Sequence, residues 1–143
     1  MVADSAPKEV FLSHSSGDRD FADRIARLLR RHGVPVWYSS TELLGAHLWH
    51  DEIGAALDRC DWFVLLLSPD SIKSMWVKRE LYYALEQERL KNRIVPLLIS
   101  ACNHRKLSWT LSACQMIDFT QSFDTGCREL LRVWGIGYRS KGK

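Results

Sequence analysis

The apolar run Trp62–Leu67 is the feature that most limits how this 143-residue chain can fold. All six of its side chains are apolar, and the polar pair Ser68-Pro69 follows at once. An alternating pattern would indicate a strand with one face in water, whereas an unbroken apolar run of this length favours a strand covered on both faces. Such strands belong to parallel sheets that carry helices on either side. The run therefore predicts an α/β protein.

Four further runs have the composition of short strands. They are Glu9–Leu12, Val34–Tyr38, Arg93–Ile99 and Gln115–Phe119. Proline cannot donate a hydrogen bond to a neighbouring strand. Pro35 therefore indicates an edge position for its strand, and Pro96 counts against a strand at Arg93–Ile99. Apolar side chains recur at helical spacing between the runs, and Asp18 is predicted to cap the first helix. This alternation predicts a five-stranded parallel sheet with helices on both faces, and the early edge strand with Pro35 and the long run Trp62–Leu67 favour the flavodoxin-like order 2-1-3-4-5.

Composition and charge narrow the functional classes. With 46% hydrophobic residues, the chain is an ordinary globular domain, and a net charge of +3 is too small to predict nucleic-acid binding. No apolar run is long enough to span a membrane. The four cysteines are far apart and no secretory leader precedes Lys8, so we expect a reduced, cytoplasmic protein. We predict one domain over residues 8–136, with flexible tails at residues 1–7 and 137–143.

Polar and aromatic residues follow the predicted strands at the edge where ligands bind in sheets of this kind, beyond the carboxyl ends of the strands. The segment Ser13-His14-Ser15-Ser16 follows the first strand, Ser68 follows the third, and the loop 39–45 lies beside them. Near the start of the next helix, Trp76 and Glu80 are four residues apart and share a face beside the apolar stripe. Together these groups predict a site for a sugar flanked by flat rings.

Glu80 is expected to be exposed and ionised, because the dipole of a helix favours negative charge near its start. Such a carboxylate can orient a ribose hydroxyl and stabilise an oxocarbenium-like transition state, and we expect its removal to change stability by no more than about 0.5 kcal/mol. A solvated glutamate beside a packing tryptophan is the plainer interpretation, and spacing alone does not decide between the two. Trp109, in the unpatterned stretch 100–113, offers a second stacking ring, and a packing role is the favoured interpretation.

Other chemistries lack their motifs. His47 and His50 lie three residues apart, and Cys102 lies near His104, but no set reaches four ligands with metal spacing, so no metal site is predicted. The sequence contains no G-x-S-x-G turn, no G-x-G-x-x-G fingerprint and no P-loop. Ser68 stands where a phospho-receiver of this fold has its acceptor aspartate.

Three stretches, in this order, resemble the TIR (Toll/interleukin-1 receptor) domain family from Lys8 to about Trp134. They are Val10–Asp18, which is similar to the first motif of the family; Trp37 through Gly45 to Ile53, which is similar to its second strand, BB loop and following helix; and Ser74-x-Trp76-x-x-x-Glu80-Leu81, which matches the W-x-x-x-E pattern of members that cleave NAD. The resemblance implies an NAD+ glycohydrolase or cyclase that releases nicotinamide and forms ADP-ribose or a cyclic isomer. NAD+ is then the substrate, and no other cofactor is implied.

The resemblance also implies roles for individual residues. Glu80 falls on the catalytic glutamate of the family. The residues that fall on substrate-binding positions are Ser13, His14, Trp37, Ser39, Leu44, Gly45, Leu48, Ser68 and Trp76. The chain departs from many relatives at Ser39, Leu44 and Val77, which affects the loop contacts more than the chemistry.

The alternative hypothesis is a non-catalytic module that signals by homotypic assembly of TIR domains. The apolar tip Leu43-Leu44 and the arginine-rich first helix support it. The two hypotheses can both hold, since catalytic TIR domains resemble one another in needing self-association. We expect a sensor domain in the same or a partner chain and a bacterial defence or cell-death pathway, with no direct nucleic-acid or membrane partner.

Overall fold

The computed structural model describes residues 6–38 and 46–140, and their side chains except those of residues 46–49. Within these residues the chain forms one five-stranded parallel sheet in the order β2-β1-β3-β4-β5, which confirms the predicted topology. The strands are β1 (Val10–Ser13), β2 (Val36–Trp37), β3 (Trp62–Leu67), β4 (Ile94–Leu98) and β5 (Ile117–Asp118). The bounds of β3 coincide with the apolar run, and β1 has the predicted length but begins one residue later, while β2, β4 and β5 are shorter than predicted.

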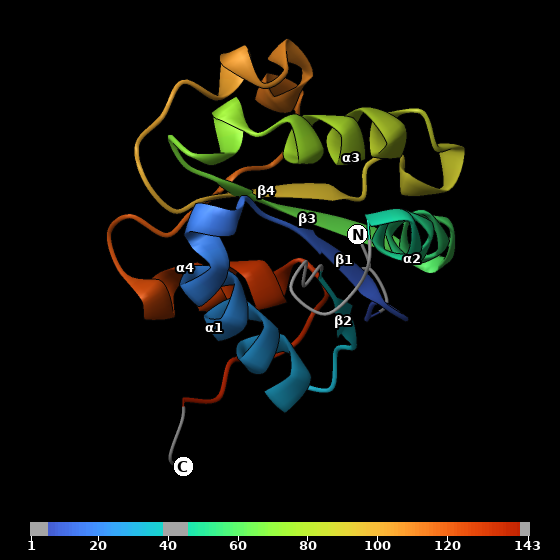
Figure 1. Ribbon diagram of the computed structural model, residues 1–143. Helices are drawn as coiled ribbons and strands as arrows, with labels where there is room; N and C mark the ends of the chain where they lie inside the picture. Colours follow the sequence, from blue (N-terminus) through green and yellow to red (C-terminus); the bar gives the residue numbers. More distant parts are fainter. Residues whose placement is uncertain (1–5, 39–45, 141–143) are drawn as a thin grey trace.

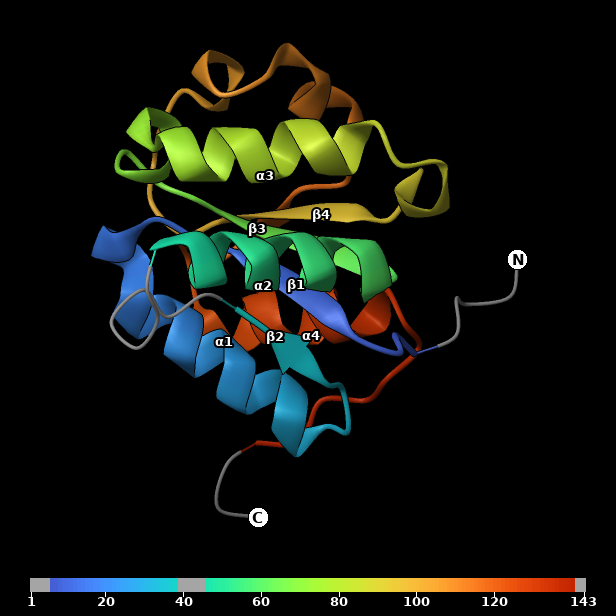
Figure 2. The same ribbon diagram turned by 45° about the vertical axis from the view of Figure 1, so that its right-hand side comes forward.

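Helices cover both faces of the sheet (Figures 1 and 2). The helices α1 (Arg19–Arg31) and α4 (Phe123–Arg132) pack on one face, and α2 (Ala46–Arg59) and α3 (Met75–Leu85) pack on the other. Short 3-10 helices lie in the connections, at Ser16–Asp18, Ser71–Lys73, Glu88–Leu90, His104–Lys106 and Trp109–Ala113. Two of them fill the stretch 100–113, for which the sequence showed no pattern.

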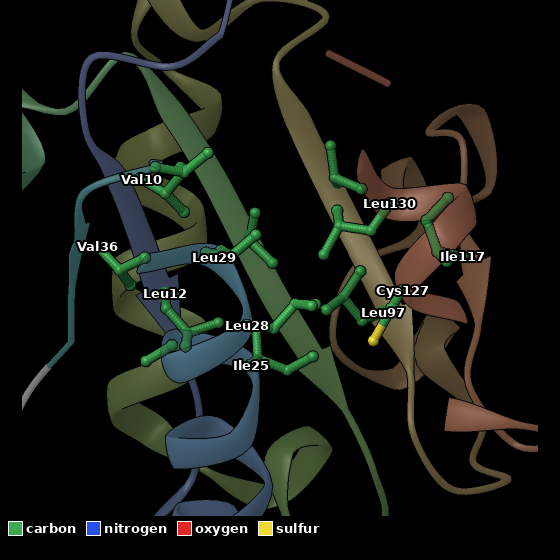
Figure 3. Packing of buried hydrophobic residues seen from close by; sticks show 14 of the residues in the cluster. Val10, Leu12, Ile25, Leu28, Leu29, Val36, Leu97, Ile117, Cys127 and Leu130 are labelled. Atoms are coloured by element: carbon green, nitrogen blue, oxygen red, sulfur yellow. The ribbon is translucent and has the colours of Figure 1, made fainter. Parts of the chain in front are cut away.

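The alternation of side chains along β3 divides the interior into two cores. Trp62, Val64 and Leu66 belong to the core beneath α1 and α4, where the helix residues Leu28 and Leu130 point toward the sheet (Figure 3). The intervening side chains of β3 belong to the core beneath α2 and α3. Every side chain of β3 is therefore buried, as the unbroken apolar run predicted.

Pro96 lies inside the sheet, in β4, although its missing N–H counted against a strand at this position. Successive residues of a parallel strand direct their backbone groups to opposite neighbours. The carbonyl of Arg93 and the N–H of Ile99 bond to β3, so the nitrogen of Pro96 faces the β5 side. Pairing with β5 begins only at Leu97, and Pro96 therefore removes no hydrogen bond from the sheet.

Two expectations about single residues are wrong. Asp18 occupies the N-cap position of α1, as predicted, but its side chain does not cap the helix; it accepts hydrogen bonds from Ser15 Oγ at 2.8 Å and from Ser68 Oγ at 2.5 Å. Trp109 is not a packing residue, because 73% of its surface is exposed. Both residues lie in connections, where backbone turns decide the direction of a side chain and periodicity says nothing about it.

Other features of the described residues bear on the predicted tails and on membrane insertion. The hydroxyl of Tyr138 donates to Asp124, and the backbone N–H of Arg139 donates to His32, so the chain just beyond residue 136 contacts α1 and α4. The predicted domain limits stay a prediction. The four cysteines are free thiols. No described helix combines the length and the apolar character needed to cross a bilayer.

Two helical glycines provide a test of the packing. A Cβ at Gly126 in α4 would lie 2.4 Å from the ring of Phe119, whereas a Cβ at Gly54 in α2 would meet no atom within 4 Å. We expect Gly126→Ala to lower the free energy of unfolding by about 1–3 kcal/mol. Gly54→Ala should raise it by about 0.5–1 kcal/mol, because alanine favours the helix. Urea unfolding of both variants measures the difference, and equal effects would contradict the packing of α4.

Candidate active site

Strand β1 directs Ser13 toward the helices α2 and α3. Phe11 points into the core beneath these helices, and Ser13, two residues later, lies on the same face of the sheet. Its hydroxyl donates a hydrogen bond of 2.6 Å to Oε1 of Glu80 in α3. Only 1% of Ser13 and 5% of Glu80 is exposed. The carboxyl ends of the strands thus hold a buried carboxyl group, at the edge where the sequence placed the site.

Helix α3 places Glu80 in its buried stripe. The helix begins after Ser74, whose side chain accepts a hydrogen bond from the N–H of Val77. Its buried residues are Val77, Glu80, Leu81 and Ala84, which recur at spacings of three and four. The expectation that Glu80 lies exposed beside the stripe is therefore wrong. Among the described residues, Glu80 is the only aspartate, glutamate, lysine or arginine that is buried.

Burial also changes the protonation of this group. Burial raises the pKa of Glu80, and the hydrogen bond from Ser13 offsets part of this rise. The resulting pKa is about 7, against the ordinary value of 4.5. The expectation of a carboxylate held ionised by the helix dipole is wrong, because Glu80 lies beyond the first turn, where the dipole acts weakly, and desolvation is the larger effect. Both protonation states are accessible near neutral pH.

A groove of about 270 Å³ lies between α2 and α3, with Glu80 in its lining. The other lining residues are His50, Ile53, Gly54, Leu57, Trp76, Arg79 and Tyr83. The ring centroids of His50 and Trp76 are 6.2 Å apart, and the guanidinium of Arg79 lies 5.5 Å from the indole of Trp76. A flat ring can stack on this aromatic surface, with a positive charge beside it and a carboxyl group within the same groove.

The predicted site residues are only partly brought together. Trp76 and Glu80 line the groove, and Ser13 reaches it through Glu80. Ser68 is buried and donates to Asp18; His14 and Trp37 are half-buried and contact Tyr38 and Phe11. None of these three lines the groove. Ser39, Leu44, Gly45 and the side chain of Leu48 lie outside the described residues.

Sequence reasoning missed three polar residues of the groove, His50, Arg79 and Tyr83. Helical spacing from Trp76 could have indicated two of them, since Arg79 is three residues and Tyr83 seven residues further along α3. Nothing in the sequence links His50 to Trp76, because the two side chains meet only when α2 packs beside α3.

Two other kinds of site carry less weight. In the described parts of the chain, no three His, Cys, Asp or Glu side chains gather as they would around a metal ion. A larger cavity of about 600 Å³, lined in part by Trp62, Ile94 and Lys91, opens where β3 and β4 begin. Ligands of doubly wound sheets bind at the opposite ends of the strands, and this cavity holds no buried acid. We therefore take the α2–α3 groove as the candidate active site.

Residues 10–131 match the family model of the TIR domain, and the chain belongs to this family. The fold agrees with that of the crystal structure of the TIR domain of the Toll-related receptor TRR-2 from Hydra magnipapillata. The TM-score is 0.70 at 18% sequence identity, over 86% of this chain and 94% of the Hydra chain. At this level of identity the agreement concerns the fold alone.

Relatives with named activities cover smaller parts of the chain. It is 28% identical over 88 residues, 61% of its length, to a 2′ cyclic ADP-D-ribose synthase from Bacteroides thetaiotaomicron. It is 30% identical, over 64% of its length, to an NAD(+) hydrolase from Actinoplanes. The matches span 31% and 14% of these relatives, so the chain corresponds to less than a third of either protein.

The buried acid predicts a stability that depends on pH. The folded state holds the proton of Glu80 up to about pH 7, whereas 4.5 is its ordinary value, so the folded chain binds more protons between these values. The free energy of unfolding of the wild type should therefore fall as pH rises through this window and level off above it. Glu80→Gln lacks this decrease, and we expect it to be more stable than the wild type at pH 8 by roughly 1–3 kcal/mol.

Urea unfolding at pH 5 and pH 8 measures this difference. The control is Glu86→Gln, at an exposed glutamate that ends the same helix, and it should show no gap that depends on pH. A constant difference between Glu80→Gln and the wild type at both pH values would contradict the buried, proton-binding state of Glu80.

Proposed function

We propose that this TIR domain cleaves the bond between nicotinamide and ribose in NAD+. One observation carries the proposal: the one buried acid of the described chain lines a groove whose wall is the indole of Trp76, at the carboxyl edge of the sheet. The relatives named as a cyclic ADP-ribose synthase and an NAD(+) hydrolase support the same chemistry.

The chemistry of the bond explains why an acid of this kind suits the reaction. Nicotinamide leaves NAD+ as a neutral molecule, so its departure needs no proton donor, while positive charge develops on the ribose. An ionised Glu80 stabilises that charge and can accept a proton from the attacking hydroxyl. A pKa of about 7 suits a general base at neutral pH. Attack by water gives ADP-ribose, and attack by a hydroxyl of the substrate gives a cyclic isomer.

The size of the groove bears on how the substrate is held. Its 270 Å³ is below the ~300–1,000 Å³ of typical ligand pockets, so the groove fits the nicotinamide and its ribose but not the whole dinucleotide. Arg79, at its rim, can attract the pyrophosphate. We propose that self-association of TIR domains, triggered by a sensor domain in a bacterial defence or cell-death pathway, supplies the remaining contacts.

A non-catalytic interaction module is the second candidate. The observation that favours it is the exposed row of Arg24, Arg27 and Arg31 on α1, which can bind an acidic surface of another TIR domain. A non-catalytic module does not explain why Glu80 is buried. Assembly without any release of nicotinamide would favour it over the enzyme.

Glu80→Gln tests the proposed reaction. We expect purified wild-type chain, assembled by crowding or by fusion to an oligomer, to release nicotinamide from NAD+. Its kcat/KM should rise with pH and level off above about 7, because the ionised carboxylate is the active form. The variant should lose at least about a hundredfold in rate at every pH. A variant that is folded and as active as the wild type would rule out Glu80 as the catalytic residue.

Trp76→Ala tests the groove as the binding site. Loss of the stacking surface should raise KM for NAD+ by about tenfold, and His50→Ala should raise it less. Trp109→Ala removes a more exposed indole that lies outside the groove and should leave KM within about twofold of the wild-type value. Steady-state nicotinamide release measures all three, and equal KM values for Trp76→Ala and Trp109→Ala would place the substrate elsewhere.

A further inference from the structure

The hydrogen bond between Ser13 and Glu80 joins the end of β1 to the middle of α3. Its donor and acceptor are 2.6 Å apart, and both residues are almost wholly buried. Ser13 lies too deep to bind a ligand in the groove, which is the role that the family resemblance implied for it. Its hydroxyl is instead directed at Glu80, the one acid among the described residues that line the groove.

We propose that Ser13 is a positioning residue, which fixes the carboxyl group of Glu80 in the lining of the α2–α3 groove through this hydrogen bond. The part of the inference that concerns turnover rests on the proposed cleavage of NAD+. The part that concerns the orientation and protonation of Glu80 does not. Ser13 ends a strand that is hydrogen bonded on both sides, so the sheet fixes the backbone from which its hydroxyl projects. The acid that accepts the hydrogen bond lies on a separate element, α3.

The surroundings of Glu80 leave few other groups for this role. Val77, Leu81 and Ala84 of the same stripe are apolar, and Ser13 is the only described side chain that hydrogen bonds to the acid. Besides Glu80, the charged or titratable groups among the described lining residues of the groove are His50 from α2, and Arg79 and Tyr83 from α3. Burial and Ser13 are the two influences on the pKa of Glu80, and they act in opposite directions. Removing the Ser13 hydroxyl therefore leaves burial as the one influence on the pKa of Glu80.

A nearby serine provides a matched control. Ser15 is also buried, and its hydroxyl also donates to a carboxylate, that of Asp18, at 2.8 Å. Ser15→Ala therefore removes a serine–carboxylate hydrogen bond only two residues beyond Ser13, without touching Glu80. Ser13→Thr keeps the donor, and Ser13→Cys replaces it with a weaker one of similar size.

The first experiment is a ¹³C NMR titration of the Glu80 carboxyl carbon in the wild type and in four variants, which are Ser13→Ala, Ser13→Cys, Ser13→Thr and Ser15→Ala. Ser13→Ala should raise the pKa of Glu80 from about 7 to about 8 or higher, because a hydrogen bond to the charged form is lost. Ser13→Cys should raise it less, and Ser13→Thr and Ser15→Ala should leave it near the wild-type value. If Ser13→Ala does not fold, the comparison of Ser13→Cys with Ser13→Thr carries the test.

The second experiment is the pH profile of nicotinamide release. Ser13→Ala should be at least about fivefold slower than the wild type at pH 7 and recover above pH 8, with the midpoint moved by the same amount as in the titration. Ser15 bonds to Asp18 and does not line the groove, so Ser15→Ala should keep the wild-type midpoint. A Glu80 pKa that does not change in Ser13→Ala or Ser13→Cys overturns the inference, and so does a uniform loss of rate with no shift of the midpoint. If the wild type releases no nicotinamide, the proposed function fails, while the titration still decides the role of Ser13.

Discussion

Burial of β3 on both faces is the constraint on which the arrangement of this protein depends. All six side chains of the strand are apolar, so helices must cover each face of the sheet to remove them from water. The helices α1 and α4 cover one face, while α2 and α3 cover the other (Figure 2). The groove lies between the two helices of the second face, and it contains the proposed site because Ser13, at the end of β1, points to that same face.

Glu80 departs from the rule that the interior is apolar. Three of its neighbours in the buried stripe of α3 are Val77, Leu81 and Ala84, and an ionised carboxylate in such surroundings lacks most of its hydration. One hydrogen bond from Ser13 offsets only part of this loss, and the pKa of the acid stays near neutral. A buried acid of this kind weakens the fold when it is ionised and is typical of a site where protonation is part of the function.

The fold alone does not separate an enzyme from a receptor module. The Hydra receptor domain has the same architecture at 18% identity, and the relatives that match this chain with named activities act on NAD or make cyclic ADP-ribose. Folds of this class host many functions, so only particular side chains can support the proposed cleavage. Here these are the buried carboxyl of Glu80, the indole of Trp76 beside it and the guanidinium of Arg79 at the rim.

The amino-acid sequence by itself determined the sheet, its strand order and the pairing of Trp76 with Glu80 on one helix. Periodicity and strand composition predict the individual elements, because these depend on neighbours along the chain, and the edge signal of Pro35 together with the buried run Trp62–Leu67 predicts the strand order. Only the tertiary structure decided that Glu80 is buried, that Ser13 bonds to it, that His50 faces Trp76 and that Pro96 fits within a sheet. Each of these depends on which element packs against a given face, and residues up to 67 positions apart in the chain meet there.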